Sequence, residues 1–146
     1  MVTPSCELFV HYSGGLGEGG IEWLRAKLEP AIADVVSQWP ESGLAQLTEI
    51  EISLIDDATI GQIHGDFMDD PTPTDVITFP HGEILVSVET AAREGEKYGK
   101  DERGETLMYI VHGLMHLAGF DDLTAEDAAE MAREQEAVWV KLIEQN

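Results

Sequence analysis

The sequence contains few basic residues and a single cysteine. Its 146 residues include 8 Lys and Arg against 29 Asp and Glu, so the formal net charge is -21. Phosphate backbones are bound largely through Lys and Arg. The composition therefore excludes a nucleic-acid-binding protein that relies on a broad basic surface. Because Cys6 stands alone, the chain forms neither an internal disulfide nor a cysteine-based zinc cluster.

Long hydrophobic runs are absent as well. No apolar stretch approaches the ~20 residues that cross a bilayer, and residues 1–5 lack the basic start of an export signal. Hydrophobic residues nevertheless make up 43% of the chain, which is enough for a buried core. We therefore expect one cytoplasmic domain over residues 1–146, with no membrane partner.

The hydrophobic pattern predicts an α+β fold. Alternating apolar and polar residues indicate strands, and apolar residues three and four apart indicate helices. Strands are predicted at 7–12, 49–55, 76–79 and 84–88, the last two as an antiparallel hairpin. Helices are predicted at 21–39, 57–67, 89–98, 101–117 and 124–143, and a proline-rich turn or loop at 69–75. The expected architecture is a small mixed β-sheet of about four strands packed against about five helices.

Two histidines on the fourth of the longer helices, in the C-terminal half, suggest a metal site. His112 and His116 are four residues apart, so both imidazoles project from nearly the same side of a helix. Most of that helix is apolar, which predicts burial, and two buried imidazoles need polar partners or an ion. Glu105, Tyr109 and the two histidines form its one polar stripe, as expected for the wall of a cleft. The alternative is a pair of hydrogen-bonded core histidines.

A third ligand can come from the turn after the helix. Gly119 follows His116 by three residues, where a left-handed conformation ends a helix and reverses the chain. The reversal could bring either Asp121 or Asp122 back to the imidazoles. Three protein ligands are typical of a hydrolytic zinc site. A zinc protease is disfavoured, because Gly113 occupies the position where that class carries its glutamate base.

Two segments resemble the YbeY-type metal-dependent endoribonucleases, which mature ribosomal RNA in bacteria. The family signature His-Gly-x-Leu-His-Leu-x-Gly-(Tyr/Phe)-Asp-His is similar to residues 112–122 here. The family segment Pro-Thr-Asp-Val-(Leu/Ile)-(Ser/Thr)-Phe-Pro is similar to residues 73–80. The resemblance covers about residues 49–140, and the two motifs at their mutual distance are specific.

The resemblance implies a site whose ligands differ from the family pattern. The family's third histidine is Asp122 here, so the implied metal ligands are His112, His116 and Asp122. A carboxylate is an acceptable zinc ligand, but its charge partly offsets the cation. We therefore expect a less acidic bound water and greater tolerance of harder ions. The implied cofactor is one divalent ion, zinc, with nickel or manganese as substitutes.

The resemblance also suggests roles for residues around the metal. The family's asparagine upstream of the second motif is His64 here, and its arginine is Met68. His64, Thr74 and Asp75 are candidate substrate-binding residues, although Asp75 could equally be a turn residue that bonds backbone amides. Asp121 is the candidate catalytic base, with a solvated turn aspartate as the alternative.

The implied function is cleavage of RNA phosphodiester bonds in rRNA maturation and ribosome quality control. The expected partners are rRNA and ribosome-associated proteins, with no DNA. Two alternatives remain: a metal hydrolase of a non-RNA substrate, and a non-catalytic ribosome-associated protein with a structural metal.

Overall fold

The structure is a computed structural model, of which residues 6–69 and 74–144 are described. Its elements follow the order β1 (Glu7–Tyr12), α1 (Gly20–Gln38), α2 (Gly43–Gln46), β2 (Glu49–Ile55), α3 (Asp57–Met68), β3 (Val76–Phe79), β4 (Glu83–Ser87), α4 (Val88–Lys97), α5 (Glu102–Leu117) and α6 (Ala125–Glu144). The predicted α+β fold is confirmed. The four predicted strands and five predicted helices all form, each within one or two residues of the predicted ends.

The four strands form one mixed sheet in the order β1-β2-β4-β3. β1, β2 and β4 run parallel, whereas β3 pairs antiparallel with β4, so the predicted hairpin is confirmed. This order leaves β3 at an edge of the sheet. One side of β3 is therefore available to neighbouring helices instead of another strand.

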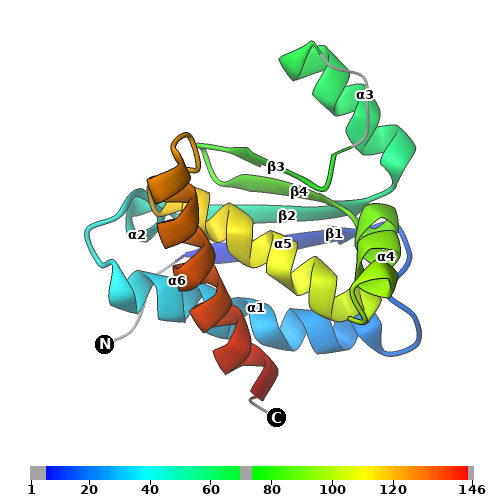
Figure 1. The fold of residues 1–146 in the computed structure, drawn as a ribbon, viewed down its shortest axis with the longest axis horizontal. Helices are drawn as coiled ribbons and strands as arrows, with labels where there is room; N and C mark the ends of the chain where they lie inside the picture. The colour runs from blue at the N-terminus through cyan, green and yellow to red at the C-terminus, as the bar shows by residue number, and fades with distance from the viewer. Residues whose placement is uncertain (1–5, 70–73, 145–146) are drawn as a thin grey trace.

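One face of the sheet carries the main hydrophobic core. Ile50, Ile52 and Leu54 alternate along β2 and are fully buried, as are Ile84 and Val86 on β4. They pack against α1 and α5, and α6 crosses these two helices on the outside (Figure 1). α5 is thus enclosed between the sheet and the outer helices.

α3 lies on the opposite face of the sheet, near the β3 edge, and projects from the rest of the molecule (Figure 1). Asp56 caps this helix, because its side chain accepts a hydrogen bond of 2.8 Å from the Thr59 amide. A second, smaller cluster of Ile60, Ile77 and Leu85 attaches α3 to the sheet. The fold therefore places α3 and α5 on either side of the β3 edge.

Two local features differ from the sequence prediction. The strand predicted to run to residue 88 ends at Ser87, because its hydroxyl accepts a hydrogen bond from the Thr90 amide and begins α4. The single turn α2 was not predicted. Its Gly43 packs closely on the end of α5, where an added Cβ would lie 3.0 Å from the Leu117 carbonyl oxygen. No helix within the described residues is long and apolar enough to cross a membrane.

Candidate metal centre and cleft

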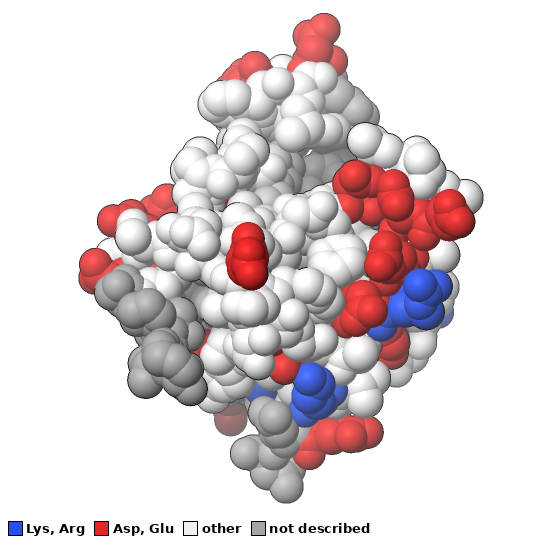
Figure 2. Space-filling view, turned by 90° about the vertical axis from the view of Figure 1, so that its left-hand side faces the viewer, with Lys and Arg blue, Asp and Glu red and all other residues white. Residues whose placement is uncertain are grey.

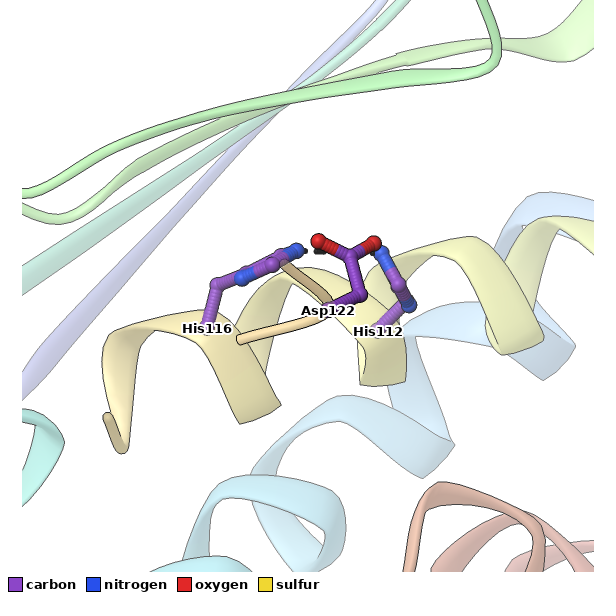
Figure 3. Close-up of side chains that lie close together, drawn as sticks. All are labelled: His112, His116 and Asp122. Carbon is purple, nitrogen blue, oxygen red and sulfur yellow. Dashed lines mark hydrogen bonds between the residues drawn. The ribbon is translucent and has the colours of Figure 1, made fainter. Parts of the chain in front are cut away.

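The two predicted ligand histidines lie on one side of α5. Asp101 caps this helix by accepting a 2.8 Å hydrogen bond from the Gly104 amide. From there α5 runs without a break past His112 and His116, whose side chains are partly buried. Figure 3 shows both imidazoles turned towards each other above the helix. The helical spacing therefore produces the predicted pair.

Hydrogen bonds to the outer ring nitrogens determine which atoms of the pair can bind a cation. The Nδ1 of His116 lies 3.1 Å from the Phe120 carbonyl oxygen, and the Nδ1 of His112 lies 2.8 Å from Oε1 of Gln135. Both partners are acceptors, so each Nδ1 carries the hydrogen and each neutral ring has its lone pair on Nε2. The two Nε2 atoms are 3.1 Å apart. Two lone pairs at this distance repel each other unless a cation or a proton lies between them.

The spacing of the pair fits a zinc ion. Two nitrogens bound at 2.0–2.1 Å with a tetrahedral angle are separated by about 3.3 Å, close to the observed separation. Asp122 completes the group, because one ligand atom from each of the three residues lies within 4.8 Å of the others. Two neutral nitrogens and one carboxylate oxygen form a donor set that zinc commonly accepts.

The turn after α5 brings Asp122 to the histidines. Gly119 has a φ of 106°, which is open to glycine and strained for other residues. Beyond it, the Phe120 amide donates a 3.0 Å hydrogen bond to the Met115 carbonyl and closes the turn. The chain then returns over the imidazoles, as Figure 3 shows. Of the two aspartates left open by the chain-reversal argument, the structure brings Asp122 to the pair.

Asp121 lies elsewhere. Its Oδ1 accepts a 3.2 Å hydrogen bond from the Leu123 amide. The residue lines a separate hollow together with Trp39 and residues of α6. This placement favours the alternative reading of a turn aspartate, and the role of catalytic base stays a prediction.

The metal group opens into a cleft. This cleft has a volume of about 730 Å³ and lies between α3 and α5 along the β3 edge. The candidate substrate-binding residues His64, Thr74 and Asp75 all line it. The full described lining is Gly43, His64, Met68, Thr74, Asp75, Val76, Ile77, Thr78, Pro80, His112, His116, Leu117 and Asp122. The fold thus brings together the two motifs that carried the resemblance.

The segment before β3 is held by its own hydrogen bonds. Asp75 Oδ1 accepts a 2.8 Å bond from the Val76 amide, and the Asp75 carbonyl accepts a 3.0 Å bond from the Ser87 amide. Asp75 therefore bonds a backbone amide, as the alternative for this residue predicts. It also lines the cleft, as expected for a substrate-binding residue. Thr74 and Asp75 thus line the same cleft as the metal group.

The rest of the polar stripe faces a neighbouring hollow. Glu105 and Tyr109 line it with Arg93, and Thr74 and Asp75 separate it from the cleft. Burial raises the pKa of the Tyr109 phenol, and the nearby carboxylates of Glu105 and Asp75 raise it further. The phenol therefore stays protonated at neutral pH, where it can donate and accept hydrogen bonds but carries no charge.

Close packing explains why residue 113 is glycine. A Cβ at Gly113 would lie 2.9 Å from Cγ2 of Ile84 and 3.0 Å from Oγ1 of Thr78. α5 contacts the sheet at this point, so there is no space for a glutamate side chain next to His112. The protease base is absent for a structural reason.

Gln135 on α6 is a functional candidate that the sequence did not indicate. Its Nε2 donates to Sδ of Met108 at 3.7 Å, which turns Oε1 towards His112. Ligand histidines commonly have such an acceptor on the outer nitrogen. The residue lies 23 positions beyond His112, and only the crossing of α6 over α5 makes the contact.

Charge is distributed unevenly around the cleft. Its described lining includes neither Lys nor Arg. On the face drawn in Figure 2, most of the middle is uncharged, apart from an isolated acidic side chain, and the molecule is hollowed beneath the projecting α3. Acidic side chains gather along one side of this view. Phosphate contacts in the cleft must therefore come from neutral donors or from a bound cation.

Comparison with known proteins agrees with this geometry. The profile of the Endoribonuclease YbeY family matches residues 21–143. A protein named Endoribonuclease YbeY from Protochlamydia amoebophila is 35% identical over 113 residues, covering 70% of this chain and 73% of that relative. Another with the same name, from Rhodopirellula baltica, is 35% identical over 136 residues, covering 86% of this chain and 67% of the relative. The chain belongs to the Endoribonuclease YbeY family.

A solved structure supports the fold. The solution structure of TM1509 from Thermotoga maritima superposes with a TM-score of 0.66 at 23% identity, covering 92% of this chain and 88% of that one. At this identity the likeness concerns the fold alone.

Proposed function

We propose that this protein is a metal-dependent endoribonuclease that cleaves RNA phosphodiester bonds in rRNA maturation and ribosome quality control. It would act in the cytoplasm, as one catalytic domain over residues 1–146. The observation that carries the proposal is the pair of facing Nε2 atoms, joined by Asp122 and opening into a large cleft, in a chain of this family.

His112, His116 and Asp122 would hold one divalent ion, zinc in the first instance and nickel or manganese as substitutes. The chemistry that such an ion supplies is Lewis acidity towards a phosphate oxygen and towards water. Three protein ligands leave room in a tetrahedral shell for one more group, as in catalytic zinc sites. The position of Asp122 at the cleft supports this arrangement.

The chain's own residues would position the RNA and the ligands. Gln135 and the Phe120 carbonyl hold the two imidazoles in the tautomer that exposes Nε2. Thr74 and Asp75, of which Asp75 is fixed by its bond to the Val76 amide, would orient the ribose and phosphate within the cleft. His64, which lines the same cleft from α3, would contact the substrate there. A general base is left to Asp121 or to another group, which the variants below distinguish.

The acidic surface bears on the partners of this protein. A net charge of -21 opposes unaided approach to RNA. We therefore include ribosome-associated proteins among the partners. A complex of such a protein with RNA can present the RNA strand and offset the electrostatic repulsion from the acidic surface. The absence of Lys and Arg from the described cleft lining also supports the alternative of a metal hydrolase with a different substrate.

The test is cleavage of a structured RNA by protein loaded with Zn²⁺, together with metal affinity by calorimetry. His116→Ala and Asp122→Ala should each weaken metal binding by at least about 10-fold, with cleavage falling in parallel. Glu126→Gln is the matched control, because Glu126 is exposed in the first turn of α6. It should retain both properties.

Two outcomes would contradict the proposal. If His116→Ala folds, loses the metal and still cuts RNA at the rate of the unaltered protein, the nuclease is a contaminant. If Asp122→Ala binds metal unchanged while His116→Ala does not, the third ligand is Asp121 or another residue. A loss of cleavage in Asp121→Ala with metal binding intact would support Asp121 as the base.

A further inference from the structure

Three aromatic rings form a row beside the cleft. Phe67 stands at the end of α3, Phe79 ends β3, and His81 follows in the turn to β4. The rings of Phe67 and Phe79 meet edge to face, with centroids 5.5 Å apart. The rings of Phe79 and His81 are stacked at 5.7 Å with an interplanar angle of 16°. We call these three residues the aromatic row.

The row begins where the cleft ends. Met68 and Pro80, the residues directly after Phe67 and Phe79, line the cleft. Side chains alternate along β3, and Thr78 faces α5. Phe79 therefore lies on the other face of the sheet, where it packs with the small cluster under α3. A strand of nucleic acid passing out of the cleft over the β3 edge would meet the aromatic row next.

The end of the row at Phe67 is more exposed than a side chain that serves only the packing of α3. Phe67 is 70% exposed, and Met68 beside it is 50% exposed. A large apolar side chain exposed beside a functional cleft is typical of a binding surface. The Phe79 ring contacts Phe67, and His81 Nε2 donates a 3.2 Å hydrogen bond to the Glu83 carboxylate, which holds the His81 ring. Groups ordered in advance lose little entropy when a ligand binds.

The charge of the cleft determines which ligand chemistry fits. The described lining of the cleft has neither Lys nor Arg, so attraction to phosphates contributes little there. Stacking of a base on an aromatic ring needs no charge and operates with every base. Base faces are available in unpaired RNA and are covered in an A-form duplex.

From this geometry we propose that the aromatic row is a subsite for unpaired RNA bases flanking the scissile bond, with Phe67 as the principal stacking ring. The inference rests on the proposed endoribonuclease function. It adds that the affinity for the RNA comes from stacking of bases on this aromatic row.

The test compares three substitutions at Phe67. In Zn²⁺-loaded protein, Phe67→Ala should raise KM for an unpaired oligonucleotide about 10-fold, which is within the range for one stacked base, with little change in kcat. Phe67→Leu keeps an apolar side chain without an aromatic face and should behave as Phe67→Ala does. Phe67→Trp should retain the original KM. Tyr98→Ala is the matched control, because Tyr98 is 68% exposed at the end of α4, outside the cleft lining.

A second measurement does not depend on cleavage. In EDTA, titration of Phe67→Trp with oligouridine should quench tryptophan emission beyond the change seen in the unaltered protein, which has three tryptophans. A duplex RNA of equal length should not. Quenching of this kind requires a base on the ring and is insensitive to a purely structural role.

The inference and the function on which it rests fail differently. If the unaltered protein cuts no RNA, the proposed function fails. The stacking subsite is overturned if the unaltered protein cuts RNA and Phe67→Ala has the same KM as Tyr98→Ala. It is also overturned if Phe67→Leu has the KM of the unaltered protein. The aromatic row would then be an apolar contact with a protein, or packing of α3 against the sheet.

Discussion

At the scale of single residues, the tautomers of two histidines prepare the metal centre. A ligand histidine binds through the nitrogen that lacks hydrogen, and the hydrogen bond at the other nitrogen decides which one that is. His116 uses a carbonyl of the turn that follows it, whereas His112 depends on Gln135 from another helix. The second contact is the more vulnerable, because one substitution on α6 removes it.

Substitution of Gln135 should therefore change metal affinity without touching a ligand. Gln135→Leu removes the acceptor and should weaken Zn²⁺ binding by about 10- to 100-fold. Gln135→Glu keeps an acceptor in place and adds negative charge, so affinity should be retained or increased. Isothermal titration with Zn²⁺ measures both, with Glu136→Gln as a control at the exposed neighbouring position. Wild-type affinity in Gln135→Leu would contradict the positioning role.

At the scale of elements, a polar network fixes the base of α3 and so the far wall of the cleft. The Asp57 carboxylate accepts hydrogen bonds from Ser87 Oγ at 2.6 Å, Thr90 Oγ1 at 2.8 Å and an Arg93 nitrogen at 2.6 Å. These bonds connect α3 to the end of β4 and to α4. Partial burial alone would raise the pKa of Asp57, but the hydrogen bonds from Ser87, Arg93 and Thr90 outweigh it and lower that pKa.

This network predicts a pH-dependent stability. Because the pKa of Asp57 is lower in the folded state than in the unfolded chain, its contribution is complete above about pH 5 and is lost as the pH falls below about 4. Asp57→Asn should lower the free energy of unfolding by about 2 kcal/mol at neutral pH, and the difference from the unaltered protein should shrink in acid. Urea unfolding at several pH values measures it.

The control for this prediction is Asp34→Asn, which removes a single ion pair of 2.8 Å with Lys141 at the surface. Such pairs contribute about 0–1 kcal/mol. A loss for Asp57→Asn no larger than for Asp34→Asn, or one independent of pH, would contradict the assignment of the network.

At the scale of the whole molecule, the charge of -21 and the cleft without described Lys or Arg predict an unusual response to salt. A basic nuclease loses RNA affinity steeply as salt rises, because bound counterions are released. Here salt screens repulsion between protein and RNA. Affinity for oligouridine should stay constant or rise between about 50 mM and about 200 mM NaCl.

Fluorescence anisotropy in EDTA measures this dependence without cleavage. A fall in affinity of about 10-fold or more over the same range would indicate several phosphate contacts by Lys or Arg. That result would contradict recognition by stacking and by neutral donors.

Much of the fold and part of the site followed from the sequence because they depend on short-range periodicity. The alternation in β2 and the helical spacing in α5 are local properties, and the spacing of His112 and His116 is set by the helix itself. The chain reversal at Gly119 also followed, but it left Asp121 and Asp122 open, and only the family resemblance pointed to Asp122. The turn α2 was missed, because a single helical turn has too few residues to show a period.

The amino-acid sequence alone determined the order of the strands and longer helices, the histidine pair, the acidic charge and the family resemblance, since each follows from composition or from neighbours along the chain. Only the tertiary structure decided that β3 lies at the sheet edge, that α3 and α5 face each other across it, and that Gln135 supports His112. It also decided that Phe67, Phe79 and His81 form one row. These contacts join residues far apart in sequence, and they depend on how buried faces pack together, which no local pattern encodes.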